Sequence, residues 1–440
     1  MRSRLVNSNH YDVVVIGCGP GGSSAAAYLS RAGKRVLVLE KEIFPRFHVG
    51  ESLLPYNQTI FRDLGVLPAI EAAGFPRKFG AQFFLGNGSL STRFVFGKGK
   101  YTREPQVFSV ERAKFDHILM KHARTTGADV REGWIVLRTD SDGTGVSVRA
   151  RDPEGNTHEF RATFLIDASG RANLTGNQEG QKVVHPRLKK IAIFGHFEGV
   201  MLDDGDAVGD TVITRLENKW FWIIPVAAGK TSVGLVLDQE EFAKAGASPD
   251  ETFQRWLNSS PVMVGRMKNA RRVAPLQNTT DFSYYNRRLV STRTLRIGDA
   301  AGFMDPIFSA GVYLAMWSGK LASEVIQKSL AKGDDGARRF LKFEKRVKAG
   351  MEFYWQMVEQ YYTKPFMELF LQPRNHANLP DAVNAVLAGE LEGGWNLRWR
   401  LRYFFFLVKW HSRRPLVPRI SFAPLAGQRE KPQVPQPEKV

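Results

Sequence analysis

Residues 11–40 decide the fold, and they read YDVVVIGCGPGGSSAAAYLSRAGKRVLVLE. An apolar, β-branched run over 11–16 leads into a cluster of glycines, and a second apolar run over 35–39 ends at Glu40. Such continuous apolar runs are typical of parallel strands that are covered on both faces. The small residues over 23–32 have helical spacing and stop at a glycine. The stretch therefore predicts one complete strand–helix–strand unit.

The glycines of this unit have the spacing of a dinucleotide site. Gly17, Gly19 and Gly22 form the pattern G-x-G-x-x-G between the first strand and the helix. The first glycine permits the tight turn, the second lets the backbone approach a pyrophosphate, and the third allows close helix–strand packing. Glu40 ends the second strand, where its carboxylate can accept hydrogen bonds from a ribose. This unit predicts a bound dinucleotide but leaves FAD and NAD open.

Composition excludes several other classes of protein. The chain has 440 residues, 43% of them hydrophobic and 24% charged, which are ordinary proportions for a globular protein. Its one cysteine, Cys18, excludes an intramolecular disulfide and a cysteine-built metal site, and we expect no metal. No apolar run reaches the roughly 18–20 residues of a spanning helix, and we expect a cytoplasmic protein without a targeting segment. A net charge of +18 predicts attraction to an anionic partner, but no motif supports nucleic acid.

Three later segments favour FAD. Residues 110–116 read VERAKFD, residues 167–170 read DASG after a short apolar run, and residues 298–301 read GDAA before a segment expected to be a second glycine-lined helix. In this order they resemble the flavoproteins of the aromatic hydroxylase type, in which the three motifs flank one FAD. The resemblance places Arg112 near the nucleotide and Asp299 at the ribityl–pyrophosphate region, although an aspartate there is also a good helix cap.

Three further segments resemble the flavin-dependent halogenases that act on phenols and pyrroles. They are FPRFHVGESLLP at 44–55, FPRKFGA at 75–81 and WFWIIP at 220–225, and the resemblance spans about residues 10 to 325. It implies an oxidoreductase in which a flavin C4a-hydroperoxide and a halide give hypohalous acid. That acid then halogenates an electron-rich aromatic ring.

The resemblance makes Lys78 the catalytic residue, because a primary amine can bind hypohalous acid or form a chloramine. The alternative is a solvated surface lysine, which is the commoner place for this residue type. The apolar neighbours Phe75, Phe79 and Ala81 favour burial, which would lower the pKa of the amine.

The halide site of the family maps to the segment DPIFSAG at 305–311. There the resemblance implies backbone amides at a helix start, around Ser309, Ala310 and Gly311, as the groups that hold chloride or bromide. Family members often have serine or threonine where Ala310 stands, and a backbone contact would survive that difference.

Two aromatic features bear on the organic substrate. Trp220 and Trp222 alternate on an expected strand, so both face one side, either as a wall between flavin and substrate or as an ordinary sheet face. Phe308 stands where tryptophan halogenases have a glutamate that assists deprotonation. Its presence favours a phenol or a pyrrole, whose own heteroatom stabilises the cation.

We expect FAD to arrive as FADH2 from a separate flavin reductase, since the chain has no second nucleotide fingerprint. The substrate is an aromatic small molecule or one bound to an acyl carrier protein. The residues expected to contact the cofactor are Gly17, Gly19, Pro20, Gly22, Ser23, Glu40, Lys41, Arg46, Gly50, Glu51, Ser52, Arg112, Asp299, Gly302, Pro306, Gly311 and Val312.

The expected fold is α/β, a two-dinucleotide-binding-domain (Rossmann-like) flavoprotein with an inserted antiparallel substrate sheet and a helical C-terminal region. A discontinuous FAD-binding domain takes residues 1–75, 105–180 and 285–330. The substrate-binding sheet takes 76–104 and 181–284. The helical region takes 331–427, and the proline-containing tail 428–440 is expected to be disordered.

The segment 395–420 is basic and aromatic and has no acidic residue. It fits a packed helix with a solvated arginine face, a docking site for an acidic carrier protein, or a contact with a membrane surface. Two other functions remain open from the sequence. One is a geranylgeranyl-reductase-like or monooxygenase-type oxidoreductase, and the other is a non-catalytic FAD-binding scaffold that docks an acidic partner.

Overall fold

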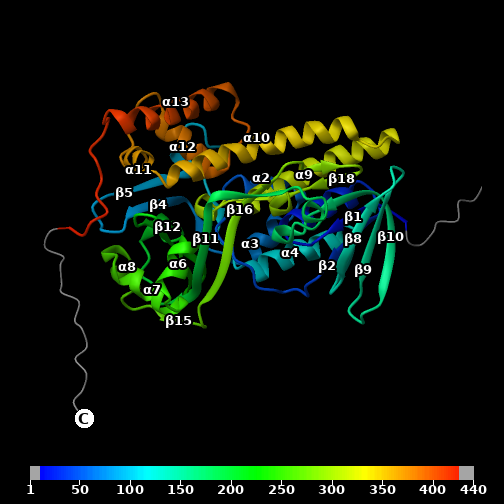
Figure 1. The fold of residues 1–440 in the computed structure, drawn as a ribbon, viewed down its shortest axis with the longest axis horizontal. Helices are drawn as coiled ribbons and strands as arrows, with labels where there is room; N and C mark the ends of the chain where they lie inside the picture. Colours follow the sequence, from blue (N-terminus) through cyan, green and yellow to red (C-terminus); the bar gives the residue numbers. More distant parts are fainter. Residues whose placement is uncertain (1–9, 426–440) are drawn as a thin grey trace, which may run out of the picture.

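The computed structural model describes residues 10–425, and within them the chain forms two large β-sheets (Figure 1). The first sheet has the order β17-β18-β10-β1-β2-β7, with β9 and β8 continuing from β10. Its centre is parallel, since β1 lies between β10 and β2 and all three run in one direction. Its strands are β1 (His10–Ile16), β2 (Val36–Glu40), β7 (Asp129–Glu132), β8 (Ile135–Ser141), β9 (Val146–Arg151), β10 (Thr157–Asp167), β17 (Val290–Ser291) and β18 (Thr294–Arg296).

The second sheet has the order β19-β16-β11-β14-β13-β12-β4-β5, with β15 beside β11. Its pairs are antiparallel except for β12 and β4, which run parallel. Its strands are β4 (Gly80–Leu85), β5 (Ser91–Val95), β11 (Lys182–Glu198), β12 (Thr211–Arg215), β13 (Trp220–Ala227), β14 (Lys230–Asp238), β15 (Arg271–Arg272), β16 (Gln277–Asn286) and β19 (Gly302–Phe303). Lys78 lies outside this sheet, in a short pair formed by β3 (Arg77–Lys78) and β6 (Val107–Phe108).

The helices cover both sheets, and α10 runs along the molecule above them (Figure 1). In the described part of the chain, no helix has the length and apolar character to cross a membrane. The helices are α1 (Pro20–Arg31), α2 (Asn57–Leu64), α3 (Leu67–Ala72), α4 (Arg112–Thr125), α5 (Leu174–Gln178), α6 (Gln239–Ala245), α7 (Pro249–Asn258), α8 (Pro261–Met267), α9 (Gly311–Lys332), α10 (Ala337–Tyr361), α11 (Lys364–Leu371), α12 (Leu379–Ala388) and α13 (Gly394–Arg413).

Helices α1 and α9 pack unusually closely, and small residues make this contact. A Cβ added to Gly319 would lie 2.7 Å from the carbonyl oxygen of Gly21, and one added to Gly21 would lie 3.1 Å from the oxygen of Ala315. Side chains at these positions would force the helices apart, because real Cβ atoms do not approach backbone oxygens this closely. The small residues at the start of α1 therefore serve helix packing as well as the glycine loop.

Two expectations from the sequence differ from the structure. The apolar run before Asp167 is not a short strand but the end of a longer one, β10, which begins at Thr157. Gly298 does not open a helix, because residues Gly298–Ala300 form a single 3-10 turn. The long helix α9 begins at Gly311, after a second such turn at Pro306–Phe308, and this is the helix start expected around Ser309, Ala310 and Gly311. The predicted disordered tail 428–440 lies outside the described residues.

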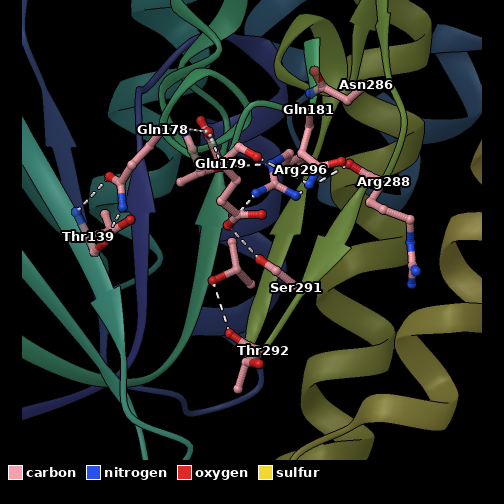
Figure 2. Close-up of polar contacts among 12 residues, drawn as sticks. Thr139, Gln178, Glu179, Gln181, Asn286, Arg288, Ser291, Thr292 and Arg296 are labelled. Atoms are coloured by element: carbon pink, nitrogen blue, oxygen red, sulfur yellow. Dashed lines mark hydrogen bonds and ion pairs between the residues drawn. The ribbon is translucent and has the colours of Figure 1, made fainter.

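A buried arginine fixes the turn that follows β10 (Figure 2). Arg296 of β18 is fully buried, donates from Nε to Oγ1 of Thr175 at 2.8 Å, and forms an ion pair with Glu179 at 2.6 Å. Thr175 in turn donates from its N–H and its hydroxyl to Asp167, at 2.8 and 2.6 Å. The aspartate of the D-A-S-G motif therefore holds the turn in place beside the glycine loop.

Candidate active site

A cavity of about 640 Å³ lies between the two sheets, which is within the range of about 300–1,000 Å³ typical of ligand pockets. Three of the residues expected in the site, Gly22, Ser23 and Lys78, do not line it. The expected residues that do are Gly17, Gly19, Pro20, Glu40, Lys41, Arg46, Gly50, Glu51, Ser52, Arg112, Trp220, Trp222, Asp299, Gly302, Pro306, Phe308, Ser309, Ala310, Gly311 and Val312.

The first and third glycines of the G-x-G-x-x-G loop have no room for side chains. Gly17 has φ +90°, and a Cβ there would lie 2.5 Å from the oxygen of Ala168. A Cβ on Gly22 would lie 2.0 Å from the oxygen of Gly17, so this glycine is needed for packing within the loop. Ser23 donates its hydroxyl to the Cys18 carbonyl at 2.7 Å. Gly22 and Ser23 thus shape the loop from behind, without facing the cavity.

Glu40 ties the loop to the next strand. Its carboxylate is buried and accepts hydrogen bonds from the backbone N–H groups of Cys18 at 2.6 Å and Glu42 at 2.9 Å. The residue also lines the cavity. Two of its acceptor positions are therefore occupied by the protein, and the others remain for a ribose.

Asp116, the last residue of the V-x-R-x-x-F-D motif, holds the arginine of that motif in place. This buried carboxylate accepts two hydrogen bonds from Arg112, at 2.7 and 2.8 Å, and one from Arg46 at 2.9 Å. Arg112 also donates to the carbonyls of Val49 and Gly50, both at 3.1 Å. Asp116 does not line the cavity itself, but it holds two cavity-lining arginines in fixed positions.

Asp299 lines the cavity and carries a perturbed carboxyl group. Enclosure by the protein raises its pKa to about 6, while Arg171 and Arg112 act in the lowering direction. Together, the closed glycine loop at the start of α1, the two fixed arginines and a cavity of suitable size fit FAD.

Lys78 is buried, with 2% of its surface exposed, so the alternative of a solvated surface lysine is contradicted. Its Nζ donates to the hydroxyl of Ser52 at 2.8 Å and to the Leu53 carbonyl at 3.1 Å, and it lies 5.4 Å from the centre of the Phe96 ring. Burial lowers the pKa of the amine to about 7, against a smaller opposing effect of Asp210. The lysine therefore exchanges its proton near neutral pH.

A cluster of three hydroxyl groups connects Lys78 to the cavity. Oγ of Ser52 lies 2.8 Å from Oγ1 of Thr211 and accepts a hydrogen bond from Ser309 at 3.0 Å. Ser52, Thr211 and Ser309 line the cavity, and Lys78 stands directly behind Ser52. The sequence analysis assigned Ser52 to the cofactor site and Ser309 to the halide site, and it did not identify Thr211. A single hydroxyl residue has no periodic pattern that would reveal such a contact.

The start of α9 presents free backbone donors to the cavity. The first N–H groups of a helix have no partner within it, and α9 begins at Gly311. Ser309 precedes it with φ +57°, and a Cβ added to Gly311 would meet no atom within 4 Å. Ser309, Ala310 and Gly311 all line the cavity, so the expected halide positions border open space.

The two tryptophans of β13 lie on one face and both border the cavity, with ring centres 5.8 Å apart. Trp220 donates from Nε1 to the Tyr362 hydroxyl at 2.8 Å, which donates to Asp305 at 2.6 Å. A Cβ on Gly234 would lie 2.2 Å from the Trp222 ring. Trp220 is thus fixed by a network with the residue that follows α10, and Trp222 by β14, where its Nε1 donates to Ser232 at 3.0 Å; the sequence revealed neither set of contacts.

Comparison with known proteins shows which family the chain belongs to. Residues 10–331 match the family model described as FAD binding domain. The 1H-pyrrole-2-carbonyl peptidyl-carrier-protein chlorinase of Pseudomonas fluorescens is 31% identical over 81% of this chain and 84% of its own length. The tryptophan 2-halogenase of Chondromyces crocatus is 34% identical over 79% of this chain and 66% of its own.

Among solved structures, the flavin-dependent brominase Bmp2 superposes with a TM-score of 0.83 at 30% identity, covering 92% of this chain and 99% of that one. The expected α/β flavoprotein fold, the cofactor FAD and the use of chloride or bromide are confirmed. These relatives give no support to a lipid-reducing flavoprotein or to a non-catalytic scaffold. The chain is an oxidoreductase that belongs to the flavin-dependent halogenases.

Proposed function

We propose that this enzyme replaces a hydrogen atom of a pyrrole or phenol ring by chlorine or bromine, with Lys78 delivering the oxidised halogen. The observation that carries the proposal is the buried amine of Lys78, bonded to a hydroxyl at the cavity surface. Bound reduced FAD would supply, with oxygen and halide, hypohalous acid. The final step consumes that acid and an aromatic C–H and yields the carbon–halogen bond and water.

Residues of this chain would hold the cofactor and the halide. The glycine loop at the start of α1 would take the pyrophosphate, Glu40 the adenosine ribose, and Arg112 and Asp299 the region between pyrophosphate and flavin. The backbone donors of Ala310 and Gly311 would hold the halide without a full counter-charge that would trap it.

Lys78 would act by hydrogen bonding and proton exchange. A protonated Nζ donates to the oxygen of hypohalous acid and makes its halogen more electrophilic. With a pKa of about 7 the same amine also gives up its proton easily and can carry the halogen as a haloamine. Ser52 and Ser309 mark the path from the halide to the amine, since their hydroxyls are in contact.

The proposed substrate class rests on Phe308. This apolar residue faces the cavity and packs on Tyr361, so it supplies no base for the cationic ring intermediate. A pyrrole or phenol stabilises that cation with its own heteroatom. Position 2 of tryptophan also belongs to a five-membered nitrogen ring, so the Chondromyces crocatus relative fits the same chemistry. The Pseudomonas fluorescens relative acts on a carrier-bound pyrrole, which supports the same presentation here. Reduced FAD would come from a separate reductase.

The test supplies reduced FAD, oxygen and chloride or bromide, and offers pyrrole-2-carbonyl carrier protein, simple phenols and tryptophan in parallel. Mass spectrometry should find halogen replacing hydrogen in a pyrrole or phenol. Lys78→Met should abolish this product while oxidation of reduced FAD continues, and Arg77→Met, which changes the exposed neighbour, should retain it. A hydroxylated product formed equally well without halide would overturn the proposal.

A further inference from the structure

Helix α13 leaves a row of aromatic side chains in solvent. Five rings follow one another along one face, with successive ring centres 6.2, 6.3, 6.2 and 6.0 Å apart. At three of these positions, Trp395, Phe406 and Trp410, 77%, 52% and 45% of the residue surface is exposed. Exposed apolar surface of this extent marks interaction sites on soluble proteins. The aromatic row consists of Trp395, Trp399, Tyr403, Phe406 and Trp410.

The opposite face of α13 is an ordinary packed face. Leu397, Leu401, Phe404 and Val408 are buried, and the Phe404 ring lies 5.6 Å from that of Phe366 in α11. Within the aromatic row, Tyr403 packs against the core, and its hydroxyl lies 3.2 Å from Nε2 of His376. The exposed surface of Trp395, Phe406 and Trp410 is what a partner outside the chain could cover.

The aromatic row is surrounded by positive charge. Between residues 395 and 420 the sequence has no aspartate or glutamate. The guanidinium of Arg414 lies over the Trp410 ring, 5.9 Å from its centre, and that of Arg400 lies over the Trp399 ring, 4.4 Å from its centre. Such a surface fits a partner that combines acidic side chains with apolar ones. The exposed cationic residues of α13 and the residue after it are Arg398, Arg402, Lys409, Arg413 and Arg414.

A second basic element, the loop 97–104, lies beside α13 and leads to the active site. Arg400 of α13 stacks over the ring of Tyr101 at 5.1 Å, and Lys98, Lys100 and Arg103 of the loop are exposed. Figure 1 shows α12 and α13 above the β4–β5 end of the second sheet. The loop therefore joins the surface around α13 to the interior of the protein.

The loop begins next to the residue that covers Lys78. Phe96 directly precedes it, and the Phe96 ring lies 5.4 Å from Nζ of Lys78. Asn384 of α12 donates to the Val95 carbonyl at 2.9 Å and fixes this segment under the C-terminal helices. Phe96 is itself fully buried, and a Cβ added to Gly99 of the loop would lie 2.4 Å from Nδ2 of Asn384, so the loop packs tightly on α12 on this side of the catalytic amine.

We propose that the aromatic row and the loop 97–104 form the docking surface for an acidic carrier-protein domain that presents the pyrrole ring on its phosphopantetheine arm. This inference rests on the proposed function, since it assigns the place where that substrate arrives. The aromatic row takes the apolar face of a carrier helix, and the arginines take its carboxylates. Lys98 and Lys100, which are exposed close to Phe96 in sequence, would take the phosphate of the arm.

An anionic membrane could attract the same residues, but two observations favour the carrier protein. The basic charge is divided between α13 and a loop that directly follows Phe96, the residue beside the catalytic lysine, which a membrane contact would not require. In addition, the Pseudomonas fluorescens relative acts on a carrier-bound pyrrole. We therefore make membrane binding an outcome of the test.

The experiment measures binding of the FAD-loaded enzyme to an isolated peptidyl-carrier domain loaded with pyrrole-2-carbonyl, by calorimetry at low and high salt. The double variant Arg398→Glu/Arg402→Glu should weaken binding at least tenfold, and Trp395→Ser/Trp410→Ser by a similar factor. Salt should weaken binding of the native enzyme and affect the charge-reversed variant less. The matched control is Lys268→Glu, an exposed charge reversal next to α8 on the other side of the second sheet, which should bind like the native enzyme.

Halogenation of a free pyrrole thioester provides the second readout. The docking variants should retain the native kcat/KM on this small substrate and lose it on the loaded carrier. Equal losses on both substrates would show a merely structural role. The docking surface would also be overturned if the native enzyme did not bind the carrier. It would be overturned as well if the variants of the aromatic row lost sedimentation with anionic vesicles but still bound the carrier. If the carrier binds and no halogenated product forms, the proposed function fails and the docking surface stands.

Discussion

Replacing Lys78 by methionine should stabilise the protein, and the size of this effect should depend on pH. Methionine keeps the length of the side chain but removes the buried amine. Burial lowers the pKa of Lys78 from its ordinary value of 10.5 to about 7. That difference corresponds to about 5 kcal/mol, at about 1.4 kcal/mol for each factor of ten in proton affinity. The native protein carries this penalty in full below about pH 7.

The sign of the pH dependence follows from proton binding. Between about pH 7 and 10.5 the unfolded chain holds the proton on Lys78 and the folded chain does not, so native stability rises by about 1.4 kcal/mol per pH unit. Lys78→Met lacks this slope. Its advantage over the native protein should therefore fall from about 5 kcal/mol at pH 7 to about 2 kcal/mol at pH 9.

Urea unfolding at pH 7, 8 and 9 with saturating FAD measures this difference. Taking the difference between the two proteins cancels titrations that both share. Lys244→Met, which changes a lysine with 75% of its side chain exposed, serves as the control and should show no such trend. A stability difference that stays constant over this pH range would refute the assignment of a neutral, buried amine.

Three other changes test the site. Ser52→Ala should let hypohalous acid escape from Lys78, so halogenated product per oxygen consumed should fall several-fold while oxygen uptake continues. Oxygen uptake falling in parallel with the product would contradict this role. Gly234→Ala should displace the Trp222 ring and lower the free energy of unfolding by about 1–3 kcal/mol, as measured in urea. Asp299→Asn should remove a pH effect: without FAD, native stability relative to the variant should fall by up to about 3 kcal/mol between pH 4 and 6.5 and then stay level, because ionised Asp299 is disfavoured in the folded state. A difference that is flat over this range would contradict the raised pKa.

The first sheet and the glycine loop could be predicted from the sequence because their signals are local. The apolar run before Gly17, the glycine spacing and the acid at Glu40 lie within thirty residues, and each matches one requirement of the strand–helix–strand unit. Burial of Lys78 was also predictable, since its neighbours in sequence are apolar. These features depend on residues that are close along the chain.

The rest of the site depends on contacts between distant residues. Ser52 and Thr211 are in hydrogen-bond contact although 159 positions separate them, and Ser52 and Ser309 are 257 positions apart. The Trp220–Tyr362 hydrogen bond spans 142 positions. The spacing of single hydroxyl or aromatic residues does not predict such pairs, because the order of the strands and the packing of the helices decide which residues come into contact. The 3-10 turn at Gly298–Ala300, where a helix was expected to open, was missed for a similar reason: helical spacing does not distinguish a 3-10 turn from the first turn of an α-helix.

The backbone contact between α1 and α9 has a consequence for how such enzymes can diversify. One helix begins at the glycine loop and the other begins at the halide positions, and their side-by-side glycines leave no freedom to slide. The closely packed pair of helices α1 and α9 therefore fixes the distance between the glycine loop and the expected halide positions. Helix α10 packs on α9 and lines the cavity with Met351 and Tyr354, so only the helices after it, α11 to α13, could be exchanged for a new substrate while the cofactor cavity keeps its dimensions.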